Sequence, residues 1–190
     1  QAAFVDIGQE KAGFLHVSDL AGDESADRVK ELEDGEEEGR GGRGGRGGGR
    51  GGGRGRREPS SYPPIESLVK KNQEIVVQVT KEPIGTKGPR LTAQVSLPGK
   101  FCVVMPALDY IGVSRKILDR AERTRLKKIV QSCRPKGYAV IVRTAGDRVE
   151  EEQLIEDITS LYERHEEIRK KARARKAPAL LREEVGLITG

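Results

Sequence analysis

Aromatic residues and long apolar runs are both scarce in this chain. Tryptophan is absent from the 190 residues, and there are three phenylalanines and four tyrosines. No apolar run approaches the roughly 20 residues that a membrane-spanning helix needs. The first residues, QAAFVDIG, have no starting methionine and no signal-peptide pattern. We therefore expect a cytosolic chain, and a fragment that begins inside a folded element.

The chain also lacks the usual signs of catalysis or metal binding. Cys102 and Cys133 are far apart and have no metal-ligand spacing, which predicts buried, reduced thiols. No HExxH, GxxxxGK[ST] or GxSxG motif is present. Of the two histidines, His16 falls in a predicted strand and His165 on the polar side of a predicted helix, where a surface role is expected. We predict no catalytic residue and no metal ligand in this chain.

Residues 21–62 differ in composition from the rest of the sequence. They include residues 39–57, which consist of 12 glycines and seven arginines, preceded by an acidic run. Basic and acidic residues nearly cancel there, at nine against ten, whereas the remaining chain has 26 against 20. Almost no large apolar side chain is present to form a core, so we predict that residues 21–62 are disordered.

The residues on either side of this segment have the patterns of short strands. Residues 2–20 predict two strands joined by GQEKAG. Residues 74–82 and 90–97 predict two more, around the glycine-containing loop 84–89. Joined across the insert, these strands would form most of a small β-barrel of the OB type.

The second half predicts an α/β unit of about one hundred residues. Residues 100–106 and 110–117 have extended patterns, and 135–146 predicts a strand that ends in a turn. Helices are predicted over 118–133, with apolar positions Ala121, Leu126, Ile129 and Val130, and over 148–175, with Leu154, Ile158, Leu161 and Ile168. The predicted fold class is therefore α+β, a barrel followed by a small α/β subdomain.

Phe4, Phe14 and Lys87 are candidates for binding RNA. Aromatic rings on barrel strands can stack on unpaired bases, and a lysine on a glycine-flanked loop can neutralise a phosphate. An alternative interpretation is that both phenylalanines fill the core of the barrel. The residues alone leave both interpretations open.

A second candidate is the sequence IVRTAG, residues 141–146, at the end of a predicted strand. The guanidinium of Arg143 offers a planar pair of donors that matches phosphate oxygens, and the hydroxyl of Thr144 adds another donor. Such a cluster suits a terminal phosphate. The alternative is a simple polar cap at the end of the strand.

Three ordered segments resemble the amino-terminal half of the bacterial ribonuclease E/G family: residues 2–20, residues 87–117 and residues 135–146. The resemblance implies an RNA-binding barrel of the ribosomal-protein S-one type over residues 1–92, and a 5′-sensor subdomain over residues 93–190 that prefers RNA with a 5′-monophosphate. It places Phe4, Phe14 and Lys87 on the RNA-contacting positions. It also implies that Arg143 and Thr144 hold the terminal phosphate, and that Gly99 and Val103 line that pocket.

The resemblance further implies metal-dependent endonucleolytic cleavage of single-stranded RNA, in RNA processing and decay in the bacterial cytoplasm. The family's Mg²⁺-binding carboxylates and its zinc-linking CPxCxG segment belong to later regions, so we expect this chain to bind RNA without cleaving it and to bind neither metal. The full-length protein would be a homo-oligomer. The sequence does not separate ribonuclease E from ribonuclease G.

Two alternatives to a nuclease fragment remain at this point. One is a non-enzymatic RNA-binding protein in which the barrel and the glycine-arginine tract act together. The other is a ribosome-associated barrel protein, which would explain residues 1–92 but not the later segments. In each case the tract is expected to add salt-sensitive, sequence-independent affinity for RNA.

Overall fold

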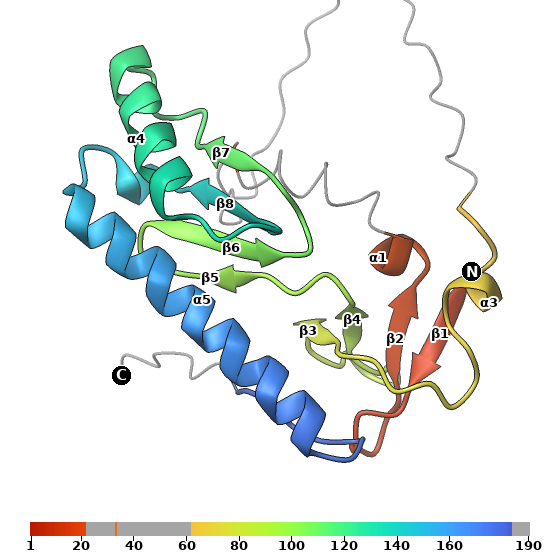
Figure 1. Cartoon of the computed structure of the whole chain (residues 1–190). Coiled ribbons are helices and arrows are strands. Elements are labelled where there is room, and N and C mark those ends of the chain that lie inside the picture. The colour runs from red at the N-terminus through yellow and green to blue at the C-terminus, as the bar shows by residue number, and fades with distance from the viewer. Residues whose placement is uncertain (22–32, 34–61, 184–190) are drawn as a thin grey trace, which may run out of the picture.

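The computed structural model describes residues 1–21, 33 and 62–183 (Figure 1). Its elements in chain order are β1 (Ala2–Val5), β2 (Gly13–His16), α1 (Ser18–Ala21), α3 (Ile65–Leu68), β3 (Gln78–Lys81), β4 (Arg90–Thr92), β5 (Leu97–Pro98), β6 (Cys102–Pro106), β7 (Ile111–Val113), α4 (Arg120–Cys133), β8 (Tyr138–Val142), the 3₁₀ helix η1 (Thr144–Gly146) and α5 (Glu151–Ala174). The strands form two four-stranded sheets. The predicted α+β class is confirmed.

The first sheet has the strand order β1-β2-β4-β3. β2 pairs antiparallel with β1 and parallel with β4, and β3 pairs antiparallel with β4. Side chains alternate across this sheet, because successive residues of a strand point to opposite faces. Leu15 and Leu91 are fully buried on one face, whereas Phe4 and Phe14 are exposed on the other.

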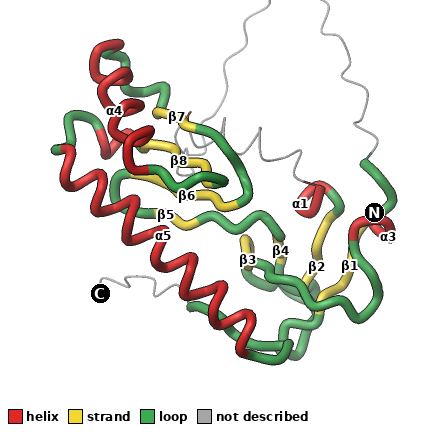
Figure 2. Tube along the Cα trace, in the orientation of Figure 1, coloured by secondary structure: helices red, strands yellow, loops and turns green. Residues whose placement is uncertain are grey.

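The described strands of this sheet do not close into a barrel, so the predicted OB barrel is not confirmed. β1 and β3 are its two edges, whereas an OB barrel closes with roughly five strands. Two of the predicted strands are also shorter than expected. β3 begins only at Gln78, and the predicted strand 90–97 is divided between β4 in the first sheet and β5 in the second (Figure 2).

The predicted disorder of residues 21–62, including the glycine-arginine tract, lies almost wholly outside the described residues. Within that segment the structure describes Ala21, which ends helix α1 and is therefore ordered, Glu33 and Tyr62. Glu33 contacts residues on either side of β7. Its side chain accepts a hydrogen bond from the Tyr110 hydroxyl at 2.9 Å, and its carbonyl oxygen accepts one from the Arg115 N–H at 2.5 Å. Glu33 is therefore held against the second sheet.

The second sheet has the strand order β5-β6-β8-β7, with α4 connecting the parallel strands β7 and β8. Figure 1 shows α5 running along this sheet and extending past it toward the first sheet. Both helices cover one face of the sheet. The buried core they share consists of Leu97, Cys102, Val104, Val113, Ile117, Leu126, Ile129, Val130, Tyr138, Val140, Val142, Val149, Leu154, Ile158, Leu161 and Ile168.

The two long helices, α4 and α5, form where the sequence pattern predicted them, whereas the short helices α1 and α3 were not predicted. The four apolar positions predicted on the long helix are all buried in α5, and its acidic first turn and basic last turn complement the helix dipole. α4 begins at the cap residue Asp119, whose carboxylate accepts the Ala121 N–H at 2.8 Å. Ala121 itself is exposed, because the buried face of α4 starts only at Leu126. Within the described residues, no helix is long and apolar enough to cross a bilayer.

Candidate nucleic-acid interface

Phe4 and Phe14 form an exposed aromatic pair on the first sheet. Their Cα atoms are register partners between β1 and β2, and the ring centroids lie 6.0 Å apart in an edge-to-face arrangement. Phe4 is 78% exposed and Phe14 is 37% exposed, while Leu15, which follows Phe14 on β2 and points to the other face, is buried. The interpretation that both rings fill a core is therefore wrong.

His16 extends this aromatic surface, a role that the sequence interpretation missed. It lies two residues after Phe14, on the same face of β2, and the two rings stack with centroids 6.4 Å apart. Its Nδ1 is 2.8 Å from the Ser18 hydroxyl, which fixes the orientation of the imidazole. The period-two spacing from Phe14 is the signal in the sequence that could have identified it.

Lys87 lies on an exposed loop that contacts the β1–β2 hairpin. The loop is closed by a bridge between Ile84 and Lys87. Lys11 of the hairpin donates from Nζ to the Gly85 carbonyl at 2.7 Å, and the Phe14 N–H donates to the Pro89 carbonyl at 2.8 Å. The structure thus brings the segment that carries Lys87 to the strand that carries Phe14.

A basic side chain not singled out in the sequence also lies beside the rings. Arg90 is the register partner of Phe14 in the parallel pair β2–β4. Its guanidinium donates to the Asp19 carboxylate at 3.1 Å and is held there, with the Arg90 side chain 43% exposed. This arrangement adds a positioned cation at the edge of the aromatic surface.

The predicted phosphate residues gather at one end of the second sheet. The parallel strands β7 and β8 end side by side there, at Val113 and Val142, and the antiparallel strand β6 begins there. Arg143 and Thr144 follow β8 directly, and the Arg143 N–H donates to the Phe101 carbonyl at 2.8 Å. Strand register alone therefore brings residues 99–101 and residues 143–144 together.

The turn before β6 is held by a carboxylate on α5. Asp157 accepts three consecutive backbone N–H groups, from Lys100 at 3.2 Å, Phe101 at 2.8 Å and Cys102 at 3.1 Å. Converging backbone N–H groups of this kind form a concavity that favours an anion. Asp157 fills that concavity, so the shape of the turn depends on a side chain more than fifty residues away.

Gly99 is tightly enclosed between Asp157 and Arg143. A Cβ atom at this position would lie 2.6 Å from one Asp157 carboxylate oxygen and 2.7 Å from the other, so no larger residue fits without movement. On its other side the Gly99 carbonyl accepts a hydrogen bond from Nη1 of Arg143 at 3.0 Å. This bond holds the exposed Arg143 guanidinium at the end of the sheet.

Thr144 is held by a serine that the sequence interpretation did not identify. Its Oγ1 lies 3.0 Å from the hydroxyl of Ser114, the residue that follows β7. Ser114 is fully buried, while Thr144 is exposed. No local pattern signals this pair, because the two residues are thirty positions apart and meet only through the parallel pairing of β7 and β8.

Val103 lies near this cluster but inside a strand. It pairs with Ile141 across β6 and β8, is only 4% exposed, and belongs to a small core on the face of the sheet opposite α5. By strand alternation Arg143 points to the same face as Ile141 and Val103. The structure therefore brings Arg143 into contact with Gly99 and places Thr144 next to it against Ser114, with Val103 packed on the neighbouring strand.

The thiols and histidines show no reactive environment. Both cysteines are free, and burial together with the charge of Asp157 raises the pKa of the Cys102 thiol, which donates to Asp157. His165 is half-buried rather than at the surface as predicted. Its Nδ1 lies 2.7 Å from the Tyr138 hydroxyl, and burial lowers its pKa. No group of three or more metal-ligating side chains is present among the described residues.

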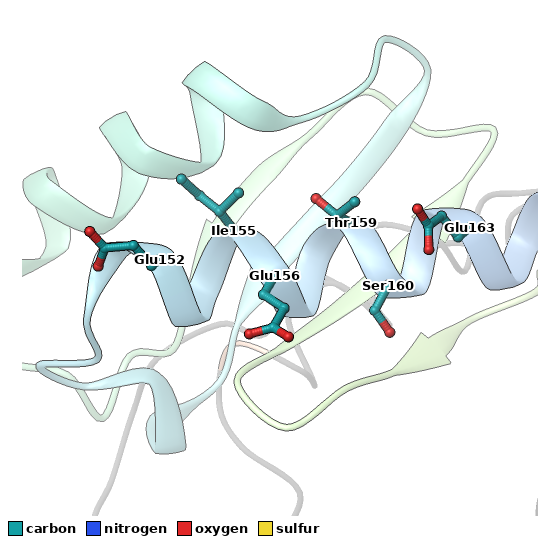
Figure 3. A pocket seen from close by; sticks show the side chains of 6 residues that line it. All are labelled: Glu152, Ile155, Glu156, Thr159, Ser160 and Glu163. Atoms are coloured by element: carbon teal, nitrogen blue, oxygen red, sulfur yellow. The ribbon is translucent and has the colours of Figure 1, made fainter.

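A surface cavity of about 450 Å³ on α5 includes no residue of either cluster (Figure 3). It is lined by Glu152, Ile155, Glu156, Thr159, Ser160 and Glu163, all of them from α5. Three carboxylates would repel a phosphate, and none of the predicted site residues takes part. The cavity therefore does not belong to the candidate interface.

Comparison with known proteins gives consistent matches. The model of the Ribonuclease E/G family matches residues 96–190. Ribonuclease E of Synechocystis sp. is 36% identical over 181 residues, covering 95% of this chain and 22% of the relative. Ribonuclease G of Salmonella typhimurium is 38% identical over 168 residues, covering 85% of this chain and 28% of the relative. The chain thus spans about a quarter of the length of these relatives.

Replacing Asp157 with asparagine should destabilise the turn before β6. The variant keeps one acceptor oxygen but loses the charge and presents an NH₂ group to the converging N–H groups. We expect the free energy of unfolding to fall by about 2–4 kcal/mol, measured by urea denaturation followed by circular dichroism. Glu156→Gln, the neighbouring exposed acid, is the matched control. Equal stability of the two variants would contradict the assignment.

Proposed function

The chain belongs to the ribonuclease E/G family, and on this basis we propose that it supplies the RNA-binding and 5′-end-sensing portion of an endoribonuclease that cleaves single-stranded RNA. The proposal rests mainly on the hydrogen bonds that hold Arg143 to Gly99 and Thr144 to Ser114 at one end of the second sheet. Relatives named ribonuclease E and ribonuclease G match at similar identity. We therefore propose only the activity that both names share, the cleavage of RNA.

The first sheet is proposed to bind single-stranded RNA through the aromatic surface of Phe4, Phe14 and His16. Exposed rings on a sheet stack on unpaired bases without strong sequence preference. Lys87 and Arg90 would contact the phosphates beside those bases. We propose that this sheet, over residues 1–92, is part of an OB-type barrel of the S-one type. Among the described strands, β1 and β3 are the edges of this sheet, where further strands could pair.

The end of the second sheet is proposed to bind a 5′-terminal monophosphate, within a sensor spanning residues 93–190. A terminal monophosphate carries more charge and one more free oxygen than a phosphodiester within the chain. The Arg143 guanidinium offers paired donors for two such oxygens, and the Thr144 hydroxyl offers a third. Gly99 and Val103 support Arg143 from the turn and from the neighbouring strand.

Binding at two surfaces would orient the substrate for cleavage. A 5′ end held by Arg143 and Thr144, with a nearby segment stacked on Phe4 and Phe14, loses much of its freedom before the reaction. Such positioning raises the rate of a reaction without taking part in the chemistry. In a full-length homo-oligomeric enzyme of the bacterial cytoplasm, the scissile phosphate would be presented to a separate catalytic region.

The described residues do not fit the Mg²⁺ or zinc sites expected of the family. No three carboxylates, histidines or cysteines converge within them, and the Cys102 thiol is buried against Asp157. We therefore derive no step through a metal from these residues. Cleavage is proposed to depend on sequence that the full-length relatives have in addition to this region.

Phe4→Ala and Phe14→Ala should each weaken the binding of single-stranded RNA. Loss of one stacking ring costs roughly 1–3 kcal/mol, which corresponds to a roughly 5- to 160-fold higher Kd in a fluorescence-anisotropy titration. Val79→Ala is the control, because Val79 is 52% exposed on β3 of the same sheet. Equal effects of all three substitutions would show that the aromatic pair has no special role.

Arg143→Ala should abolish the preference for 5′-monophosphorylated over 5′-hydroxyl RNA. The substitution removes the charged donors that distinguish the two ends, so the ratio of their Kd values should fall to about 1. Arg164→Ala, which removes an exposed arginine from α5, should leave the ratio unchanged. A ratio that survives Arg143→Ala would refute the proposed phosphate site.

The 190-residue chain alone should bind RNA without cleaving it. A 5′-monophosphorylated single-stranded RNA incubated with the chain and Mg²⁺ should remain intact on a denaturing gel, because no convergent carboxylates are found among the described residues. A full-length ribonuclease G serves as the positive control. Cleavage at specific positions by the purified chain would overturn the proposal that this region binds RNA and a separate region cleaves it.

A further inference from the structure

Ser114 is a buried polar residue with a defined hydrogen-bonding role at the end of the second sheet. It is 0% exposed and directly follows β7. Its backbone is fixed on both sides, since its N–H donates to the Val142 carbonyl at 2.8 Å and its carbonyl accepts from Nη1 of Arg123 at 2.6 Å. The Ser114 side chain is therefore held in place by the backbone.

The contacts of its hydroxyl favour one direction for the hydrogen bond to Thr144. The Ser114 Oγ accepts the N–H of Lys116 at 3.3 Å, and an N–H group can only donate. The hydroxyl hydrogen of Ser114 then needs an acceptor, because a buried donor without a partner is costly. Among the described residues, the acceptor that the structure gives this hydroxyl is the Thr144 Oγ1, 3.0 Å away.

This direction leaves the hydrogen of the Thr144 hydroxyl free. Thr144 accepts from Ser114, so its own O–H can donate outward from an exposed position. A phosphate monoester near neutral pH offers mainly acceptor oxygens, so a hydroxyl that binds it must donate. A threonine that donated to Ser114 instead would present only lone pairs to the phosphate.

We propose that Ser114 is a positioning residue for recognition of the 5′-terminal phosphate: it orients the Thr144 hydroxyl as a donor toward the phosphate oxygen. The inference rests on the proposed function of Arg143 and Thr144 and adds a chain of hydrogen bonds that runs from the Lys116 N–H through Ser114 to Thr144. Ser114 itself does not touch the RNA. Its effect is transmitted wholly through Thr144.

The test compares Ser114→Ala, Thr144→Val and the double variant in the 190-residue chain. The probe is one decaribonucleotide carrying either a 5′-monophosphate or a 5′-hydroxyl group, titrated by fluorescence anisotropy. Ser114→Ala should lower the ratio of the two Kd values about 3- to 10-fold. Thr144→Val should lower it at least as much, and the double variant should be no worse than Thr144→Val, because one pathway carries both effects.

Ser132→Ala is the matched control, since the Ser132 hydroxyl donates to the Ile129 carbonyl on α4, away from the site. Should Ser114→Ala fail to fold, Ser114→Cys replaces it, with a smaller loss expected because a thiol is a weak donor. A wild-type ratio in the Ser114 variant would overturn the inference. The inference would also be overturned if Ser114→Ala lowered the ratio of Kd values as much in the Thr144→Val variant as it does in the wild-type chain. A wild-type chain that does not distinguish the two RNAs would instead refute the proposed function and the inference with it.

Discussion

The carboxylate of Asp157 is the interaction on which the candidate phosphate site depends most. It accepts three consecutive backbone N–H groups of the turn before β6 and lies against Gly99, whose carbonyl in turn holds the Arg143 guanidinium. Asp157 is positioned by the neighbouring apolar residues of α5, which pack on the sheet at helical spacing. The packing of a helix thus determines the position of a cation at the end of the sheet.

The second requirement is the pairing of parallel strands. β7 and β8 end together, so Ser114 and Thr144 meet although they are thirty residues apart in sequence. Gly146, two residues later, is buried where a Cβ atom would lie 2.6 Å from a Val142 methyl group. The sequence RTAG therefore combines a donor pair with a turn that only glycine can complete so close to the sheet.

The aromatic surface lies on the first sheet, so the two proposed RNA contacts are on different sheets.

Much of this arrangement could be predicted from the sequence, because periodicity is a local property. The buried positions of α5, the buried strand β6 and the strand β8, which ends just before Arg143, all follow from apolar spacing. The division of residues 90–97 between two sheets could not be predicted, since a continuous extended pattern does not show where a chain leaves one sheet for another. The exposure of Phe4 and Phe14 could not be predicted either, because it depends on which face of the sheet packs on the core. Asp157 and Ser114 act through contacts distant in sequence, and no spacing rule reveals them.

The central claim is that the end of the second sheet recognises a 5′-terminal monophosphate. The most direct measurement is the change in backbone amide chemical shifts of the ¹⁵N-labelled chain on adding a short RNA, once with a 5′-monophosphate and once with a 5′-hydroxyl group. We expect the amide chemical shifts of residues 99–101 and 143–146 to change only with the monophosphate, and those of β1 and β2 to change with both RNAs. Identical shifts at residues 143–146 with either RNA, or none with the monophosphate, would contradict it.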